Sequence, residues 1–88
     1  MTEINAENTP LEFPCQLGVK AMGHAGANLA DRVEAIVAER ATVLDVHTAG
    51  SRHGRYISVT VTMEAQSREQ LEGVYRALGE DDAVIFTL

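Results

Sequence analysis

Residues 56–65 alternate between polar and apolar side chains, and this alternation constrains the fold more than any other feature. The apolar row is Ile57, Val59, Val61, Met63 and Ala65, and the polar row is Tyr56, Ser58, Thr60, Thr62 and Glu64. Because successive side chains of a strand point to opposite faces, the pattern predicts a strand with one face in the core. The chain must therefore cover one side of a sheet and leave the other side uncovered.

Five further segments with regular patterns flank this strand. Alternation predicts a strand over residues 15–22, another over 42–48 and a short final strand over 83–88. Apolar side chains at helical spacing predict a helix over residues 28–40, with Asn28 as its N-cap. A second helix is predicted to start at the capping-box sequence that begins with Ser67 and to stop at Gly79. The predicted order of elements is β-α-β-β-α-β.

This order favours a ferredoxin-like split sandwich, which is an α+β fold. Right-handed crossovers put both helices on the same face of a four-stranded antiparallel sheet, and the opposite face stays open. In the predicted hairpin, Gly50 lies opposite Arg55 and His47 lies opposite Ser58 on the open face. The same register places Leu44 in the apolar row that faces the helices.

Length, charge and cysteine content restrict the class of protein. The 88 residues include 13 acidic and seven basic side chains, for a formal charge of −6, which repels phosphate backbones and predicts no nucleic-acid partner. The lone Cys15 cannot form an internal disulfide, which fits a reducing compartment. No signal sequence or membrane-spanning run is recognised, so we expect a cytoplasmic protein with no membrane partner. Residues 1–10 are predicted to be a flexible tail and residues 11–88 a single domain.

Four short motifs follow one another in a distinctive order and spacing. They are Leu11-Glu12-Phe13-Pro14, Val19-Lys20-Ala21-Met22-Gly23, the hairpin residues Ser51, Gly54, Tyr56 and Ser58-Val59-Thr60-Val61-Thr62, and the helix residues Leu71-Glu72, Tyr75 and Leu78-Gly79. With these motifs the chain resembles the YbeD family of small, uncharacterised bacterial proteins, over nearly everything after the tail. The resemblance implies a fold similar to that of the regulatory ACT-like domains.

A glycine-containing segment before the first helix is a candidate ligand-binding site. It includes Gly23, His24, Gly26 and Asn28, and its shape resembles the ligand loop of ACT domains. Free N–H groups and the dipole at a helix N-terminus can hold an anion or a carboxylate. The alternative is that the glycines only let the chain turn tightly and approach the sheet.

The open face of the sheet is the second candidate site. It is predicted to carry Lys20, His47, Tyr56, Ser58 and Thr60. These side chains are mostly compact, whereas exposed sheet is usually covered by long charged ones, so the row is a candidate recognition surface for a protein or a small ligand. Both rows of the final strand are partly apolar, so its edge could pair with a second copy or a partner strand. The alternative is an ordinary solvated sheet.

Metal binding and catalysis are not expected. His24, His47, His53 and Cys15 lack the spacing of metal ligands, and no paired carboxylates or activated nucleophile can be recognised. The segment Gly54-Arg55-Tyr56 is similar to one in RNA-recognition modules, but a second stacking aromatic is missing. The sequence predicts a non-catalytic regulatory or adaptor domain, without cofactor, that binds a small metabolite or a partner protein. The alternatives are a small enzyme of unrecognised type and an RNA-binding module.

Overall fold

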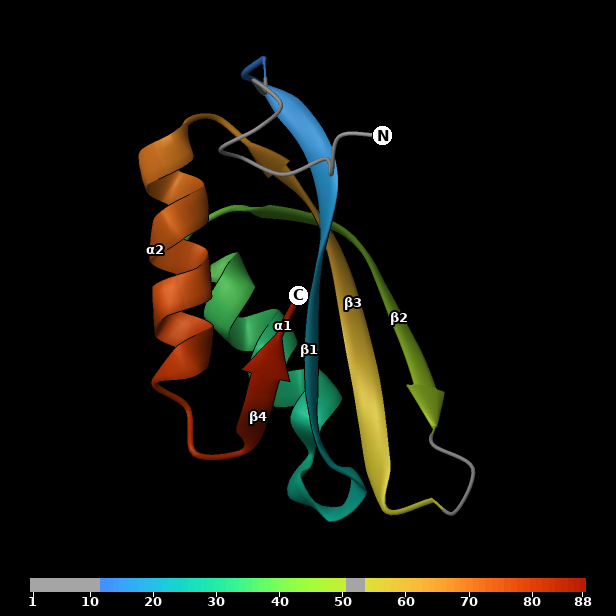
Figure 1. The fold of residues 1–88 in the computed structure, drawn as a ribbon. Coiled ribbons are helices and arrows are strands. Elements are labelled where there is room, and N and C mark those ends of the chain that lie inside the picture. Colours follow the sequence, from blue (N-terminus) through green and yellow to red (C-terminus); the bar gives the residue numbers. More distant parts are fainter. Residues whose placement is uncertain (1–11, 51–53) are drawn as a thin grey trace, which may run out of the picture.

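The computed structural model describes residues 12–50 and 54–88, and it has the predicted order of elements (Figure 1). The strands are β1 (Cys15–His24), β2 (Thr42–Gly50), β3 (Tyr56–Ala65) and β4 (Val84–Thr87). The helices are α1 (Leu29–Ala38) and α2 (Arg68–Gly79), and a 3-10 turn, η1 (Ala25–Ala27), joins β1 to α1. The predicted ferredoxin-like fold class is confirmed. The predicted tail and the tip of the hairpin lie outside the described residues.

The four strands form one antiparallel sheet in the order β2-β3-β1-β4, so β2 and β4 are its edges. Both helices pack on one face of this sheet, and the core lies between the two layers. The buried apolar side chains are Val19, Ala21, Leu29, Val33, Val37, Val59, Val61, Met63, Ala65, Leu71, Val74 and Leu78. Four members of the apolar row of β3 are among them, which confirms that this row faces the core, although Ser58 of the polar row is also buried.

The connection between β2 and β3 is longer than predicted. Gly50 lies opposite Ile57, two residues beyond its predicted partner, and His47 lies opposite Thr60, again two residues further along. The predicted register was therefore wrong. Because a shift of two residues restores the same face of a strand, His47 still lies on the open face.

A break in the pairing of β2 changes the position of Leu44. Val43 lies opposite Met63, but the next pair is Asp45 with Thr62, so Leu44 has no partner on β3. Such a bulge re-aims the side chain of the extra residue. Leu44 is 45% exposed, and its predicted place in the core was wrong.

The two helices begin in different ways. Asn28 precedes α1 in the left-handed region, at φ 52°, and its side chain makes no capping hydrogen bond, contrary to the prediction. At α2, the Ser67 hydroxyl accepts a hydrogen bond from the Gln70 N–H at 3.1 Å, as the capping-box pattern predicts. The Gln70 side chain also donates to the Arg40 carbonyl oxygen at 2.8 Å, which ties the segment after α1 to the first turn of α2.

At Gly23, β1 packs closely against the segment that enters β4. It is buried, and a Cβ atom there would overlap the carbonyl oxygen of Ala83 and lie 3.0 Å from a methyl carbon of Leu29. A glycine is therefore required by packing. Because β1 continues to His24, Gly23 and His24 belong to this strand and not to the loop before α1.

Candidate functional site

The open face of the sheet carries all five residues that were predicted to lie on it. Lys20, Thr60 and His47 are neighbours in one row across β1, β3 and β2. Ser58 is only 9% exposed, and its hydroxyl lies 3.5 Å from a carbonyl oxygen of β2. Tyr56 lies at the end of β3 and is 40% exposed. The polar row is therefore continuous along the sheet. Its accessible side chains lie before and after Ser58, which is itself nearly covered.

An apolar hollow lies on the molecular surface at the Tyr56 end of the sheet. Its lining side chains are Met22, Tyr56, Ile85 and Phe86, and its volume is about 330 Å³. Ile85 and Phe86 are 51% and 47% exposed, and together with Met22 and Tyr56 they form a contiguous apolar surface. We call this feature, lined by Met22, Tyr56, Ile85 and Phe86, the apolar hollow.

A bulge in β4 brings two consecutive side chains to the apolar hollow. Met22 lies opposite Phe86 and Gly23 lies opposite Val84, so Ile85 is an extra residue on β4. In a regular strand, consecutive side chains point to opposite faces, whereas a bulge changes the direction of one of them. Ile85 and Phe86 can therefore both line the apolar hollow.

The structure divides the predicted ligand-binding segment among three elements. Gly23 and His24 end β1, Gly26 lies in η1, and Asn28 precedes α1. Close packing accounts for Gly23, as described above. His24, Gly26 and Asn28 are exposed, and a Cβ at Gly26 would meet no heavy atom within 4 Å. All of the named residues of the segment except Gly23 therefore offer an accessible surface.

His24 connects this segment to the apolar hollow. The centroid of its imidazole ring lies 5.1 Å from the centroid of the Tyr56 ring, and the two ring planes are tilted by 33°. The Ala25 N–H donates to the Arg55 carbonyl oxygen at 3.0 Å, which fixes η1 beside the start of β3. The two sites predicted separately from the sequence therefore meet at the His24–Tyr56 pair.

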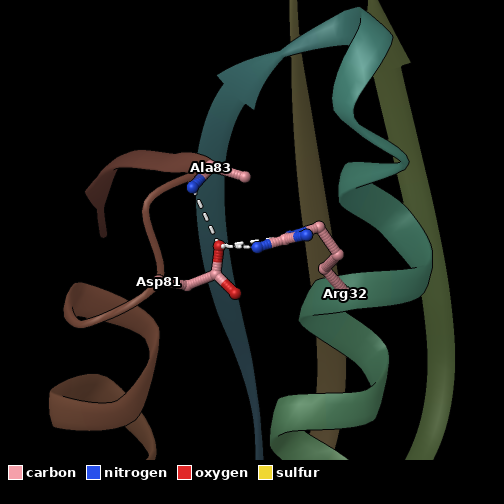
Figure 2. Close-up of polar contacts among 3 residues, drawn as sticks. All are labelled: Arg32, Asp81 and Ala83. Carbon is pink, nitrogen blue, oxygen red and sulfur yellow. Dashed lines mark hydrogen bonds and ion pairs between the residues drawn. The ribbon is translucent and has the colours of Figure 1, made fainter.

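An ion pair fixes the segment between α2 and β4. Figure 2 shows one carboxylate oxygen of Asp81 between the Ala83 N–H and the Arg32 guanidinium. The oxygen accepts from Ala83 at 2.8 Å and from Arg32 Nη2 at 2.9 Å and Nε at 3.2 Å. The Ala83 N–H, and then the Arg32 side chain, hold the pKa of Asp81 below its usual range. Asp81 thus sets where β4 begins.

Tyr75 holds the other end of β4. Its hydroxyl donates to the Leu88 carbonyl oxygen at 2.9 Å, and the same oxygen accepts from the Lys20 N–H at 3.2 Å. Burial raises the pKa of the Tyr75 hydroxyl. β4 is only four residues long, and contacts at both of its ends hold it against β1.

Within residues 12–50 and 54–88, no three His, Cys, Asp or Glu side chains are placed to hold a metal ion. His24 and His47 lie apart on the sheet, Cys15 is half-buried against the core, and His53 lies outside the described residues. No helix in the same part of the chain is long and apolar enough to cross a membrane.

Two features of this region were not predicted from the sequence, namely the position of Met22 in the apolar hollow and the ion pair between Arg32 and Asp81. Met22 was not assigned to a site, although the alternation of Gly18 and Lys20 already placed it on the open face. The pair of Arg32 and Asp81 joins residues that are 49 positions apart, and no local pattern connects them. The position of Met22 could have been found from the periodicity of β1. The pair of Arg32 and Asp81 can be recognised only in the tertiary fold.

Comparison with known proteins gives consistent matches over most of the chain. The family described as protein of unknown function (DUF493) matches residues 8–88. A UPF0250 protein of Vibrio cholerae is 42% identical over 79 residues, which cover 89% of this chain and 86% of that protein. A UPF0250 protein of Nitrosomonas europaea is 34% identical over 85 residues, covering 93% and 98% of the two chains. The resemblance predicted from the four motifs is confirmed.

Two solved structures share the fold. The solution structure of protein HP0495 from H. pylori matches with a TM-score of 0.76 and 12% identity, covering 100% of this chain and 98% of that one. The crystal structure of the ACT domain from the GTP pyrophosphokinase of Chlorobium tepidum matches with a TM-score of 0.70 and 6% identity, covering 85% and 96%. At these identities the matches show a common fold, and they confirm the expected ACT-like architecture.

Proposed function

Because the chain belongs to the DUF493 family, whose UPF0250 members are its relatives, we propose that it is a non-catalytic adaptor or regulatory domain that binds a partner on its open sheet face. The observation that carries this proposal is the apolar hollow formed by Met22, Tyr56, Ile85 and Phe86. The likeness to an ACT domain supports a regulatory role. The cytoplasmic location expected from the sequence stays a prediction.

The exposed apolar side chains favour association with a partner. An exposed half of a side chain such as Ile85 or Phe86 presents on the order of 100 Å² of surface to water. Covering that area contributes about 2–3 kcal/mol before the cost of association is subtracted. Because Ile85 and Phe86 border one hollow, a single apolar group of a partner can cover both side chains.

Polar groups around the apolar hollow can orient what binds there. The His24 ring contacts the Tyr56 ring in a tilted arrangement on one side, and the row of Lys20, Thr60 and His47 continues from the hollow along the open face. These side chains provide hydrogen-bond donors and acceptors next to an apolar contact, which is the usual arrangement of a recognition surface. We therefore propose that both candidate sites from the sequence contact the same partner.

The titratable groups with shifted pKa values do not line the apolar hollow. Among the described residues, these groups are Asp81 and Tyr75, and both make internal hydrogen bonds that hold β4 in place. The side chains that line the apolar hollow include no carboxylate, amine or thiol. A catalytic site usually places an acid, a base or a nucleophile beside the space where a substrate binds.

Photo-crosslinking in cells that express the protein tests this proposal. A benzophenone amino acid is introduced at Phe86 in one variant and at Leu44 in a matched variant on the opposite edge, where exposure is similar. We expect a discrete crosslinked product from the Phe86 position that disappears with Met22→Asp, and no such product from the Leu44 position. Equal products at both positions, or no product at Phe86, would exclude the apolar hollow as the binding surface.

A further inference from the structure

The outer edge of β4 offers unused backbone groups beside the apolar hollow. Lys20 and Leu88 exchange two backbone hydrogen bonds, at 3.2 and 2.8 Å. Bonded and non-bonded pairs alternate along an antiparallel ladder, so the N–H and C=O of Thr87, which lies opposite Ala21, point away from β1. Because β1 is the only described strand that pairs with β4, these two groups face the outside of the sheet.

The β4 edge carries neither a charge nor a proline that would oppose strand addition. Residues 84–88 contain no charged side chain and no proline. The opposite edge, β2, differs because it carries Asp45 and His47. Of the two edges, β4 is therefore the one suited to pairing with another strand.

Negative charge lies at the beginning of β4. Glu80 and Asp82 are exposed, and neither has an ion-pair partner among residues 12–50 and 54–88. Asp81 between them is neutralised by Arg32. Since Asp82 is only three positions before Ile85, a strand that pairs along β4 would bring one of its ends close to this charge. A basic side chain at that end would be electrostatically favoured.

A second copy of the chain is a poorer fit to this edge. Tyr56, Ile85, Phe86 and Leu88 together expose on the order of 400 Å², about half of the area that each partner of a stable complex usually buries. Two copies also carry a formal charge of −6 each, and this net repulsion opposes their association. A short segment with basic residues avoids both problems.

We propose that the β4 edge binds an extended peptide segment of a partner protein, which pairs with Thr87 as an additional strand and places one apolar side chain in the apolar hollow. A basic side chain of this segment lies near Asp82. The inference rests on the proposed adaptor function and specifies the chemistry of the partner. Backbone hydrogen bonds supply affinity in this mode of recognition, and the hollow and the charge supply specificity.

The first test is selection of a displayed library of short random peptides against the whole chain. We expect the selected peptides to share one aliphatic or aromatic residue and a nearby lysine or arginine. Ile85→Ser and Phe86→Ser should each weaken the binding of a selected peptide by about tenfold or more, because they remove the walls of the hollow. Leu44→Ser, the matched change at the opposite edge, should leave binding unchanged. Asp82→Asn should weaken binding less at high salt than at low salt.

The second test addresses the backbone pairing. Thr87→Pro removes the N–H that points outward and leaves the bonds between Leu88 and Lys20 available, as edge strands tolerate. We expect the affinity for a selected peptide to fall by about tenfold while circular dichroism stays unchanged. If this variant fails to fold, two N-methylated versions of a selected peptide test the same bonds on the parent chain, one methylated at the odd positions and one at the even positions. Because only every second N–H of the peptide faces β4, one version should lose binding and the other should keep it.

Three results would overturn the inference. The first is a selection that yields no specific peptide. The second is a selected peptide whose binding is unchanged by Phe86→Ser and by both sets of N-methylation, and the third is a concentration-dependent dimer that Phe86→Ser dissociates. The last result would assign the edge to a second copy. The crosslinking experiment separates this inference from the proposed function, because a crosslink at Phe86 without peptide binding would retain the function and reject only the peptide.

Discussion

Replacing Gly23 with alanine tests whether the glycine serves packing or ligand binding. The new Cβ would overlap the Ala83 carbonyl oxygen, and that oxygen belongs to the backbone that enters β4. Backbone cannot rotate away as the end of a flexible side chain can. Leu29 would also have to move, because its methyl carbons lie 3.0 and 3.1 Å from the new atom. The strain therefore falls on the strand that borders the apolar hollow.

We expect Gly23→Ala to lower the free energy of unfolding by about 3 kcal/mol, the upper end of the usual cost of overpacking. In a domain of this size, such a loss lowers the melting temperature by roughly 10–20 °C. Gly26→Ala is the matched control, because its Cβ meets no heavy atom within 4 Å and its φ is not positive. It should change the free energy by less than about 0.5 kcal/mol.

Urea unfolding of both variants, followed by circular dichroism, measures the difference. A Gly23→Ala variant as stable as the parent would refute the close approach of β4 to β1. Equal losses from both variants would show that the whole segment from Gly23 to Asn28 is under a common constraint. Either result would reopen the interpretation of this segment as a ligand loop.

Four further substitutions probe other parts of the structure. Val61→Ala should cost about 2–3 kcal/mol because Val61 is fully buried, whereas Thr60→Ala on the open face should cost less than about 1 kcal/mol; equal costs by urea unfolding would contradict the one-sided core. Asp81→Asn should lower stability at pH 7 by about 0.5–1 kcal/mol. Because folding lowers the pKa of Asp81, its contribution is present above the unfolded-state pKa and is lost as the pH falls through the folded-state pKa, so the gap between variant and parent should close in acid. Gly73→Ala should raise the melting temperature, by the equivalent of about 0.5–1 kcal/mol, since a Cβ there meets nothing within 4 Å; a lower temperature would indicate that the glycine has another role.

Periodicity predicts this fold well wherever one face of an element is buried. The bounds of β3 agree with the alternation over residues 56–65, and the start of α2 agrees with the capping pattern at Ser67. The register of β2 against β3 could not be predicted because it depends on the length of the hairpin connection, which periodicity does not determine. The exposure of Leu44 follows from a bulge that the alternating pattern conceals.

The candidate site could be predicted only in part for the same reason. Alternation placed Tyr56 and Lys20 on the open face, and the composition of the last strand predicted exposed apolar side chains there. The apolar hollow itself depends on the bulge at Ile85, which brings that side chain beside Phe86. A bulge arises from the contacts of β4 with β1, so it cannot be read from either strand alone.

The most direct measurement of the role of the β4 edge is amide hydrogen exchange of the chain in an extract of cells that express it, compared with purified protein in buffer. The Thr87 N–H points away from β1 and should exchange quickly in buffer. If the β4 edge and the apolar hollow are the binding surface, exchange at Thr87 should slow in the extract, and amides along β2 and α1 should not change. Slowing along β2 or α1 with Thr87 unaffected would show that partners bind elsewhere and would contradict the proposed function.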